Sequence, residues 1–289
     1  MRTEIIYGMP DVDYRKADGI AQSDLKECEK SPYHYKWKVD HREPHEPTSS
    51  MVQGLVTESF LFFKDQWNAD GKFVIEPEDF NGRTKEGKAW KEAQKGKIIA
   101  TKDHIETATR MMQAIKRHAH IADIFSEGNP QTAWFAPFKY GNTELQKKGL
   151  VDWIPETEGV PWNMLVDYKT TQCASKKEFS KKMAEYRYDV QSAYYLDGFN
   201  EAEQQAKPHF DLFCFVVQET VAPWEAAAYV IDPKHLGVGR LQYHTWLEAI
   251  ARATESGFWP SYQDEKPEFI ELPKWFTKQV ANPFLTIWD

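Results

Sequence analysis

The stretch GLVDWIPETEGVPWNMLVDYKT, residues 149–170, decides how the centre of this chain folds. Its apolar first part predicts one β-strand, the proline-bounded middle predicts a turn, and the last part predicts a second strand. Side chains alternate between the two faces of a strand, so Asp167 and Lys169 project together while Tyr168 packs on the opposite face. Pairing of the two strands as a hairpin allows Asp152 to lie across from Asp167. The stretch therefore predicts two carboxylates and an ammonium group close together on a sheet.

Two facing carboxylates predict a binding site for a hard divalent cation. Carboxylates about 4 Å apart repel each other by roughly 1 kcal/mol in water and by about 4 kcal/mol at an effective dielectric constant of 20. A half-buried pair is therefore expected to take a cation between its members. The alternative is an ordinary solvated strand face, because an Asp-x-Lys pattern also occurs on such faces.

A further carboxylate lies in MVQGLVTESFLFF, residues 51–63, which is apolar nearly all round and predicts a buried helix. Glu58 is its only charged residue, and an ionised carboxylate in such surroundings is costly unless it pairs with a cation. Glu58 is thus a metal ligand, or it pairs with one Lys or Arg, or its carboxylate extends to solvent. Gly54, one turn earlier, costs about 1 kcal/mol of helix propensity, which predicts close approach of another backbone or of a ligand.

Residues 185–199 have a helical periodicity that predicts one helix. Tyr188, Gln191 and Tyr195 share one face of it. An amide and two phenols on an amphipathic helix fit a polar site, and they are also typical of an interface.

The remaining pattern predicts the α/β class, with a mixed central β-sheet flanked by helices. Further strands are expected at residues 132–140, 210–217 and 226–231. Helix signals are an N-cap at Ser23, a stop at Ser31-Pro32, an amphipathic helix from Ile105 to Ala119, and a final helix over 238–256 capped by Gly257.

A chain of 289 residues is long enough for one domain with a single core. We expect one domain over residues 1–289, with a core at about 20–262 and an extension, residues 263–289, of unassigned role. No apolar run is long enough to span a bilayer and the N-terminus lacks an apolar signal region, so a cytoplasmic location without membrane contact is expected. The three cysteines form no CxxC pair and are expected to be structural thiols.

The spacing from Asp152 through Asp167 to Lys169 resembles the motif of the PD-(D/E)XK nucleases. This resemblance implies that the two aspartates hold Mg²⁺ and that Lys169 assists the attacking water. It also implies the carbonyl of Tyr168 as a metal ligand. Val151 stands where the motif name has proline, a departure that affects neither ligand nor base.

Two other segments resemble motifs of the RecB-like, lambda-exonuclease-like and RecE-like (exonuclease VIII) members of that superfamily. Gly54-x-x-x-Glu58 is similar to their early-helix motif and implies that Glu58 completes the metal site, as in the lambda branch, whereas RecE-type proteins carry His there. Gln191-x-x-x-Tyr195 resembles their Gln-x-x-x-Tyr motif, which implies contacts with the metal-bound water and with DNA phosphates.

The likeness extends over most of the chain. Residues 20–35 look like the opening helix and Ser-Pro-x-His-Tyr turn of phage RecE-type exonucleases, and Trp259-Pro-Ser-Tyr262 resembles their Trp-Pro-x-Tyr loop. It therefore runs from about residue 20 to residue 262.

The net charge of −8 argues against a broad nucleic-acid-binding face, although a focused one is compatible with it. The residues expected to contact DNA flank the hairpin and occupy the following segment: Lys147, Lys148, Lys176, Lys177, Lys181, Lys182, Arg187, Tyr188 and Tyr195. About six such cations would make the affinity for DNA fall steeply with salt. The alternative for residues 176–182 is a solvated loop and helix face.

The resemblance implies a Mg²⁺-dependent exonuclease, with Mn²⁺ able to substitute, that digests linear double-stranded DNA from a 5′ end in phage-type recombination. It also implies a homo-oligomeric ring, a trimer or tetramer, and a single-strand annealing protein as partner. The alternatives are a structure-specific endonuclease or repair nuclease on the same fold, and a non-catalytic DNA-binding or assembly module. A histidine-based metal hydrolase is disfavoured because the nine histidines show no HExxH spacing.

Overall fold

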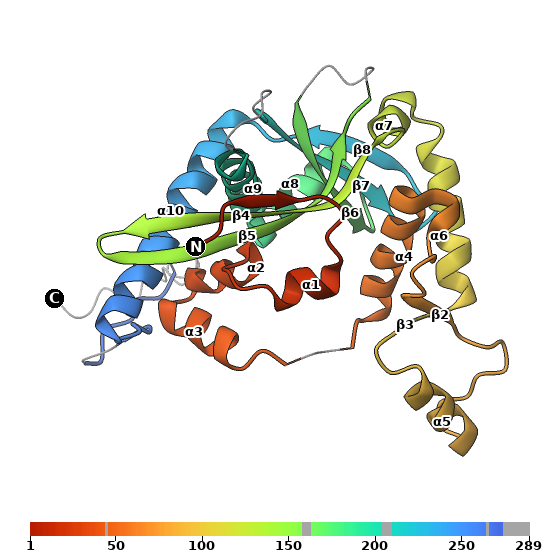
Figure 1. Cartoon of the computed structure of the whole chain (residues 1–289), viewed down its shortest axis with the longest axis horizontal. Helices are drawn as coiled ribbons and strands as arrows, with labels where there is room; N and C mark the ends of the chain where they lie inside the picture. The colour runs from red at the N-terminus through yellow and green to blue at the C-terminus, as the bar shows by residue number, and fades with distance from the viewer. Residues whose placement is uncertain (44–45, 158–162, 204–209, 264–265, 274–289) are drawn as a thin grey trace, which may run out of the picture.

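A mixed sheet of six strands forms the centre of the protein (Figure 1). The computed structural model describes residues 1–43, 46–157, 163–203, 210–263 and 266–273. In sheet order the strands are β1 (Glu4–Ile6), β4 (Gly128–Tyr140), β5 (Thr143–Pro155), β6 (Met164–Thr171), β7 (Leu212–Glu219) and β8 (Ala226–Val230). Strands β6 and β7 run parallel, and the other neighbours run antiparallel. The predicted α/β fold with a mixed sheet is confirmed.

The predicted hairpin is present as β5 and β6, which pair antiparallel with Trp153 opposite Val166. The alternation along β6 is also as predicted, because Met164, Val166 and Tyr168 belong to one buried cluster while Leu165 belongs to another. Strand β6 therefore carries apolar side chains into both layers of the core, and this fixes the direction in which Asp167 points. Most of the predicted turn, from Pro155 to Pro161, lies outside the described residues, which end at 157 and resume at 163.

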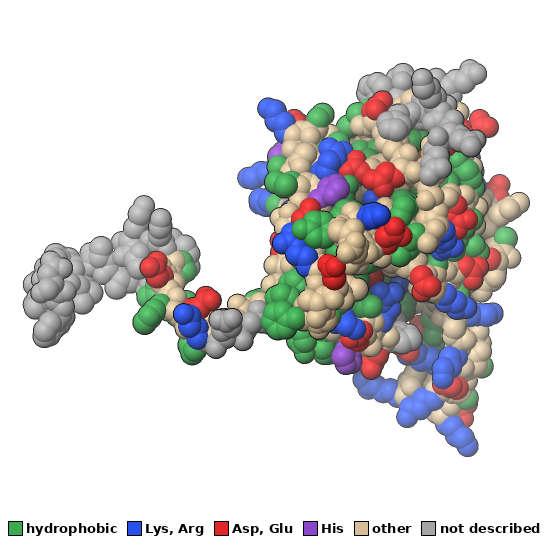
Figure 2. All heavy atoms as spheres, turned by 60° about the vertical axis from the view of Figure 1, so that its left-hand side comes forward, with side chains coloured by type: hydrophobic (Ala, Val, Ile, Leu, Met, Phe, Trp, Pro, Cys, Tyr) green, Lys and Arg blue, Asp and Glu red, His purple; other side chains and the backbone are tan. Residues whose placement is uncertain are grey.

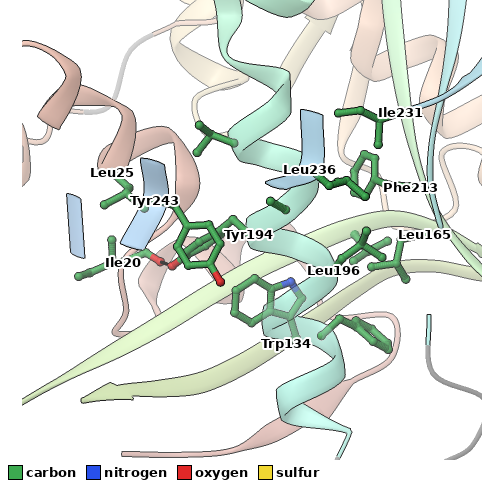
Figure 3. Close-up of a cluster of buried hydrophobic side chains, with 14 of the residues drawn as sticks. Ile20, Leu25, Trp134, Leu165, Tyr194, Leu196, Phe213, Ile231, Leu236 and Tyr243 are labelled. Atoms are coloured by element: carbon green, nitrogen blue, oxygen red, sulfur yellow. Dashed lines mark hydrogen bonds between the residues drawn. The ribbon is translucent and has the colours of Figure 1, made fainter. Parts of the chain in front are cut away.

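One face of the sheet is covered by α9 (Tyr188–Ala202) and α10 (Pro233–Ser256), which pack side by side (Figure 1). Figure 3 shows the core that they enclose, with Trp134 of β4 against Tyr194 of α9 and Tyr243 of α10. The ring centroids of Trp134 and Tyr194 are 5.2 Å apart, and those of Tyr194 and Tyr243 are 5.4 Å apart. Gly257 ends α10 in the left-handed conformation, as expected.

The other face is covered by α4 (Ser49–Phe63), α6 (Lys102–Ile115) and α7 (Ala119–Ile124). Leu61 and Phe62 of α4 pack there against Trp153 and Tyr168 of the hairpin. Between α4 and α6 the chain forms a two-stranded sheet and a helix at one end of the molecule (Figure 1). These elements are β2 (Phe73–Ile75), α5 (Lys85–Ala93) and β3 (Ile98–Ala100).

The N-terminal and C-terminal segments that resemble RecE-type exonucleases lie next to each other. Helices α1 (Asp11–Lys16), α2 (Gln22–Leu25) and α3 (Pro32–Asp40) open the fold, with 3-10 turns η1 (Lys26–Glu29) before α3 and η2 (Lys64–Gln66) after α4. The ring of Tyr35 stacks on that of Trp259 at 6.0 Å, and the backbone N–H of Tyr33 donates to the carbonyl of Pro260. The N-terminal turn and the Trp-Pro segment thus form one corner of the protein.

Several element boundaries differ from those predicted. Residues 185–199 span the end of α8 (Lys176–Tyr186) and most of α9, because Arg187 adopts the left-handed conformation between them. The predicted helix over 105–119 ends at Ile115. Ser23 lies inside α2, and Ser31 caps the start of α3 by accepting the His34 N–H instead of only stopping a helix. Local patterns locate helices better than their ends, because a capping side chain can serve either neighbour.

Burial of Cys28 and Cys214 agrees with the expectation of structural thiols. Cys173 is half-buried, and like the other two it forms no disulfide. Within the described ranges no helix is long and apolar enough to cross a bilayer. Most of the predicted extension, residues 263–289, lies outside the described residues, and residues 266–273 contain no helix or strand.

The ring of Trp134 leaves no room for a side chain at Gly198 of α9. A Cβ added at Gly198 would overlap the indole ring of Trp134, which is fully buried. Gly198→Ala is therefore expected to destabilise the protein by about 1–3 kcal/mol, as overpacked cores do. Gly237→Ala in α10 is the matched control, because a Cβ there meets no atom within 4 Å. The control should raise stability by about 0.5–1 kcal/mol. Urea unfolding of both variants checks this, and equal stabilities would contradict it.

Candidate active site

Asp152 and Asp167 face each other where β5 and β6 begin to separate. The pairing of Trp153 with Val166 places the next residues, Asp152 and Asp167, at the same level of the two strands. Oδ2 of Asp152 accepts the backbone N–H of Tyr168 at 2.9 Å. The carboxylate of Asp152 thus takes the place of a strand carbonyl, and this bond holds it beside β6.

Asp167 is buried, with 3% of its surface exposed, and two side chains contact its carboxylate. Nε2 of Gln191 donates to Oδ1 at 2.5 Å, and the ammonium group of Lys169 forms an ion pair with Oδ2. Within the described chain, Oδ2 accepts no hydrogen bond of good geometry. The structure therefore brings together Asp152, Asp167, Lys169 and Gln191, as the sequence predicted, and leaves one carboxylate oxygen incompletely satisfied.

Glu58 projects from α4 toward the same group. Burial raises the pKa of Glu58 to about 7; the ammonium of Lys169 opposes this rise, and the negative charge of Asp167 adds to it. Glu58 is thus within electrostatic reach of both residues. A Cβ added at Gly54 would lie 3.4 Å from Oγ1 of Thr170, an ordinary contact, so the predicted unusually close approach at Gly54 is not observed.

The charges of the cluster do not balance. Burial raises the pKa of Asp152 well above its usual value, and the charges of Asp167 and Glu58 raise it further. Burial disfavours the ammonium of Lys169, but Asp167 and Asp152 outweigh burial, so the pKa of Lys169 is raised and it keeps its proton. Three carboxylates therefore share one ammonium, which leaves a formal excess of two negative charges when all are ionised.

This donor set fits a hard divalent cation in charge and chemistry, since carboxylate oxygens are the ligands that Mg²⁺ and Mn²⁺ prefer. The ligand set predicted from the sequence stays a prediction. Across the residues that the structure describes, no three acidic, histidine or cysteine side chains stand close enough to hold a metal. The reason is that Asp167 is engaged by Lys169 and Gln191, while Asp152 is engaged by the Tyr168 N–H.

Tyr168 separates Asp167 from Lys169 on β6. Its ring points into the opposite layer, where its hydroxyl donates to Oε1 of Gln218 at 2.6 Å. The predicted role of its carbonyl as a metal ligand stays a prediction.

Two of the predicted DNA-contacting lysines are buried, which contradicts that role. The ammonium of Lys147 forms an ion pair with Glu201. The ammonium of Lys148 donates to the carbonyls of Tyr14 and Ala17 at 3.0 and 2.7 Å. Both side chains lie inside the protein because the N-terminal segment and α9 cover this part of β5. Neither ammonium can reach a phosphate in this arrangement.

Arg187 also has structural partners. Its guanidinium bonds to Asp189 and Glu29, each at 3.1 Å, and lies over the ring of Trp246. It therefore ties the break between α8 and α9 to the N-terminal helices instead of pointing freely at solvent.

The two predicted tyrosines lie near the acids. The Lys169 ammonium lies 5.2 Å from the centroid of the Tyr188 ring. The ring of Tyr195 packs between Trp134 and Phe213. Burial raises the pKa of Tyr195, with smaller contributions from the Tyr14, Asp167 and Asp152 charges. Their predicted contacts with phosphate stay predictions.

Exposed cations do occur on α8, which follows β6 directly. Lys176, Lys177 and Lys181 are exposed, and Lys182 donates to Oγ1 of Thr171 at the end of β6 at 2.6 Å. On the face shown in Figure 2, basic and acidic side chains are interspersed over most of the body, and basic side chains gather at its lower tip. The remaining predicted candidates for phosphate contacts lie on α8, which begins soon after β6.

One residue at the site has an unusual backbone conformation that was not predicted from the sequence. Gln131 lies near the start of β4 with a left-handed φ of 46°, although Pro130 and Thr132 on either side pair with β5. Gln131 has no partner in the pairing of β4 with β5, and Asp152 is the β5 residue at the same level. Gly128, Asn129 and Pro130 directly before it are turn-forming residues, but only the folded arrangement shows that the register skips Gln131.

The raised pKa of Glu58 predicts the pH dependence of stability without metal. Between the ordinary glutamate pKa of 4.5 and the folded-state pKa of about 7, the folded protein keeps a proton that the unfolded chain has lost. The stabilisation from Glu58 is therefore full below 4.5 and is lost as the pH rises through about 7. In chelator, the melting temperature of the parent should fall more than that of Glu58→Gln between about pH 5.5 and about pH 8. Identical pH profiles would contradict this environment for Glu58.

Comparison with known proteins agrees with this geometry. A family model described as a PDDEXK-like domain of unknown function (DUF3799) matches residues 21–272. Among solved structures, a "Putative exonuclease" from Eubacterium rectale superposes with a TM-score of 0.57 at 14% identity, covering 94% of this chain and 98% of that chain. At this identity the likeness shows the fold alone.

Two yeast structures match more weakly. Rai1 of Scheffersomyces stipitis, with (3′-NADP)⁺ and calcium ion, has a TM-score of 0.29 at 10% identity, covering 88% of this chain and 75% of that chain. Rai1 of Candida albicans, with pU5-Mn²⁺, has a TM-score of 0.29 at 9% identity, covering 88% and 77%. Such scores carry no argument here. No curated protein matches the sequence.

The family match covers the hairpin acids, the lysine and the Gln191 helix, and it supports a nuclease. The resemblance predicted from the sequence is thereby confirmed: this chain belongs to the PDDEXK-like family DUF3799.

Proposed function

We propose that the protein is a metal-dependent DNA exonuclease that digests the ends of linear double-stranded DNA. The observation that carries this proposal is the buried group of three carboxylates around one lysine, with Gln191 bonded to the central acid. Such an excess of negative charge is costly unless a cation offsets it. The similar fold of a protein named as an exonuclease agrees with the proposed reaction class.

Glu58, Asp152 and Asp167, with the carbonyl of Tyr168, are the residues that would hold one or two Mg²⁺ ions, and Mn²⁺ has the same ligand preference. A bound ion would supply positive charge at the scissile phosphate and lower the pKa of a water. Gln191 fixes the orientation of the Asp167 carboxylate through its amide. In the metal-free protein Lys169 keeps its proton, so it is not a base in that state. Its ammonium group would offset the negative charge that develops during the reaction.

Exposed lysines of α8 would bind the phosphates of the incoming strand. Lys176 and Lys177 remain available for this, and Lys181 would exchange its exposed ion pair with Glu178 for a phosphate. Lys147, Lys148 and Arg187 have internal partners. With fewer cations than the sequence predicted, affinity for DNA should fall with salt less steeply than for six phosphate contacts.

The finer parts of the proposal rest on the family resemblance. They are a 5′-to-3′ direction, preference for Mg²⁺, a trimeric or tetrameric ring around DNA, a single-strand annealing protein as partner, and a role in phage-type recombination. Light scattering during gel filtration would give the number of subunits directly.

Digestion of a linear duplex labelled separately at its 5′ and 3′ ends tests the function. We expect early release of the 5′ label with Mg²⁺ or Mn²⁺, none with chelator, and no cleavage of covalently closed circular DNA. Early release of the 3′ label would reverse the direction. Cleavage of circles would favour the endonuclease alternative, and inactivity with both metals on several substrates would favour a non-catalytic module.

A further inference from the structure

A pocket opens beside Glu58, between α4, the following residues 66–72 and the start of β4. Its volume is ≈ 150 Å³. The lining residues that matter here are Glu58, Phe63, Trp67, Asp70, Lys72 and Gln131. Glu58 lines this pocket, and the charges of Asp167 and Lys169 shift its pKa. The pocket therefore adjoins the acidic cluster. We call it the Glu58 pocket.

Lys72 supplies the Glu58 pocket with positive charge. In the described parts of the chain, no carboxylate oxygen lies within 4 Å of its ammonium group, in contrast to Lys147 or Lys169. The Asp70 carboxylate is engaged elsewhere, because it accepts the backbone N–H of Lys72 at 3.0 Å. The ammonium lies 5.7 Å from the centroid of the Phe73 ring, and its charge lowers the pKa of Glu58, but it forms no direct ion pair with a carboxylate in the described residues. Next to a site for phosphodiester chemistry, such an ammonium is suited to a phosphate oxygen.

Aromatic rings form another part of the wall. Phe63, the last residue of α4, is 40% exposed although it lines a pocket. Trp67 stacks between Phe60 and Phe73, at 4.6 and 5.7 Å between ring centroids, and is thereby held in place. A cavity of about 150 Å³ accepts a molecule of the size of benzene. The pocket is therefore large enough for the ring of one nucleobase and too small for a base pair.

Gln131 brings a neutral amide to the same pocket at a conformational cost. Its left-handed φ of 46° is unfavourable for a residue other than glycine, and its carbonyl accepts the Met9 N–H at 3.0 Å. Backbone strain of this kind persists mainly where the side chain has a function. Glycine at this position would relieve the strain, so stability alone does not favour glutamine here.

We propose that the Glu58 pocket binds one unpaired nucleotide next to the scissile phosphate, with its base against Phe63, its phosphate at Lys72 and its polar edge at the Gln131 amide. The preferred substrate is then a duplex end whose last bases are unpaired. This inference rests on the proposed function for its chemistry, but binding can be measured without cleavage.

Equilibrium binding in chelator tests the pocket, with an internally labelled duplex that has either paired or two mismatched terminal nucleotides. We expect the parent to bind the mismatched end roughly tenfold more tightly, the size of effect that one base stacked on an aromatic ring gives. Lys72→Ala should lose most of this preference, and Gln131→Gly should lose it while melting no lower than the parent. Lys97→Ala, an exposed lysine outside the pocket lining, is the matched control and should keep the preference.

The outcomes separate the two proposals. Equal affinity of the parent for both ends, or unchanged preference in Lys72→Ala and Gln131→Gly, would overturn the pocket assignment even if DNA is digested. Preference for mismatched ends that these two variants lose would support the pocket even if no metal restores digestion, and the exonuclease proposal alone would then fail.

Discussion

Asp167→Asn is expected to reduce metal-dependent digestion of linear DNA by roughly a thousandfold, the scale on which losing one key charge-stabilising group lowers kcat. Asn keeps a carbonyl oxygen for the Gln191 amide, but it loses the charge that pairs with Lys169 and would bind a cation. Digestion rates at saturating Mg²⁺, together with calorimetric titration of Mn²⁺, would measure the loss of activity and of metal affinity.

The fold should survive this change. Asn and Asp have the same shape, and removing one of three clustered carboxylates also removes repulsion, which compensates for the lost ion pair. Far-UV circular dichroism and the melting temperature check this point. Asp40→Asn is the matched control, because Asp40 pairs with Lys36 on the surface of α3, where an ion pair contributes little. Digestion by Asp167→Asn at the parental rate would end the assignment of Asp167.

Lys169→Met is expected to lose activity by roughly a hundred- to a thousandfold while retaining, or increasing, the affinity for divalent metal. Met has a similar length and fills the same space, so the change removes the ammonium with little loss of packing. Without that ammonium, the three carboxylates present a more negative site to a metal ion.

The two variants therefore separate metal binding from charge stabilisation during the reaction. Manganese titration and digestion rates should fall together in Asp167→Asn and diverge in Lys169→Met. Lys95→Met, an exposed lysine after α5, is the control for loss of a positive charge. A parallel loss of metal affinity and activity in Lys169→Met would mean that Lys169 shapes the site and has no direct part in the reaction.

The hairpin and its acids could be predicted because the information is local. An apolar alternation of period two fixes which of Asp167 and Tyr168 faces which layer, and a period of 3.6 places Gln191 and Tyr195 on one face of α9. The break at Arg187 could not be predicted, since the residues on both sides have helical patterns. Its left-handed conformation is held by Glu29 and Trp246, which come from distant segments.

The sequence by itself determined the sheet class, the hairpin and the acid–lysine–amide set on neighbouring elements, because these follow from short repeating patterns. The tertiary structure alone decided that Lys147 and Lys148 are internal, that Gln131 is strained beside Asp152, and that Lys72 shares a pocket with Glu58. The physical reason is that a charged side chain becomes buried or exposed according to what a remote segment places over it, and no local periodicity records that covering.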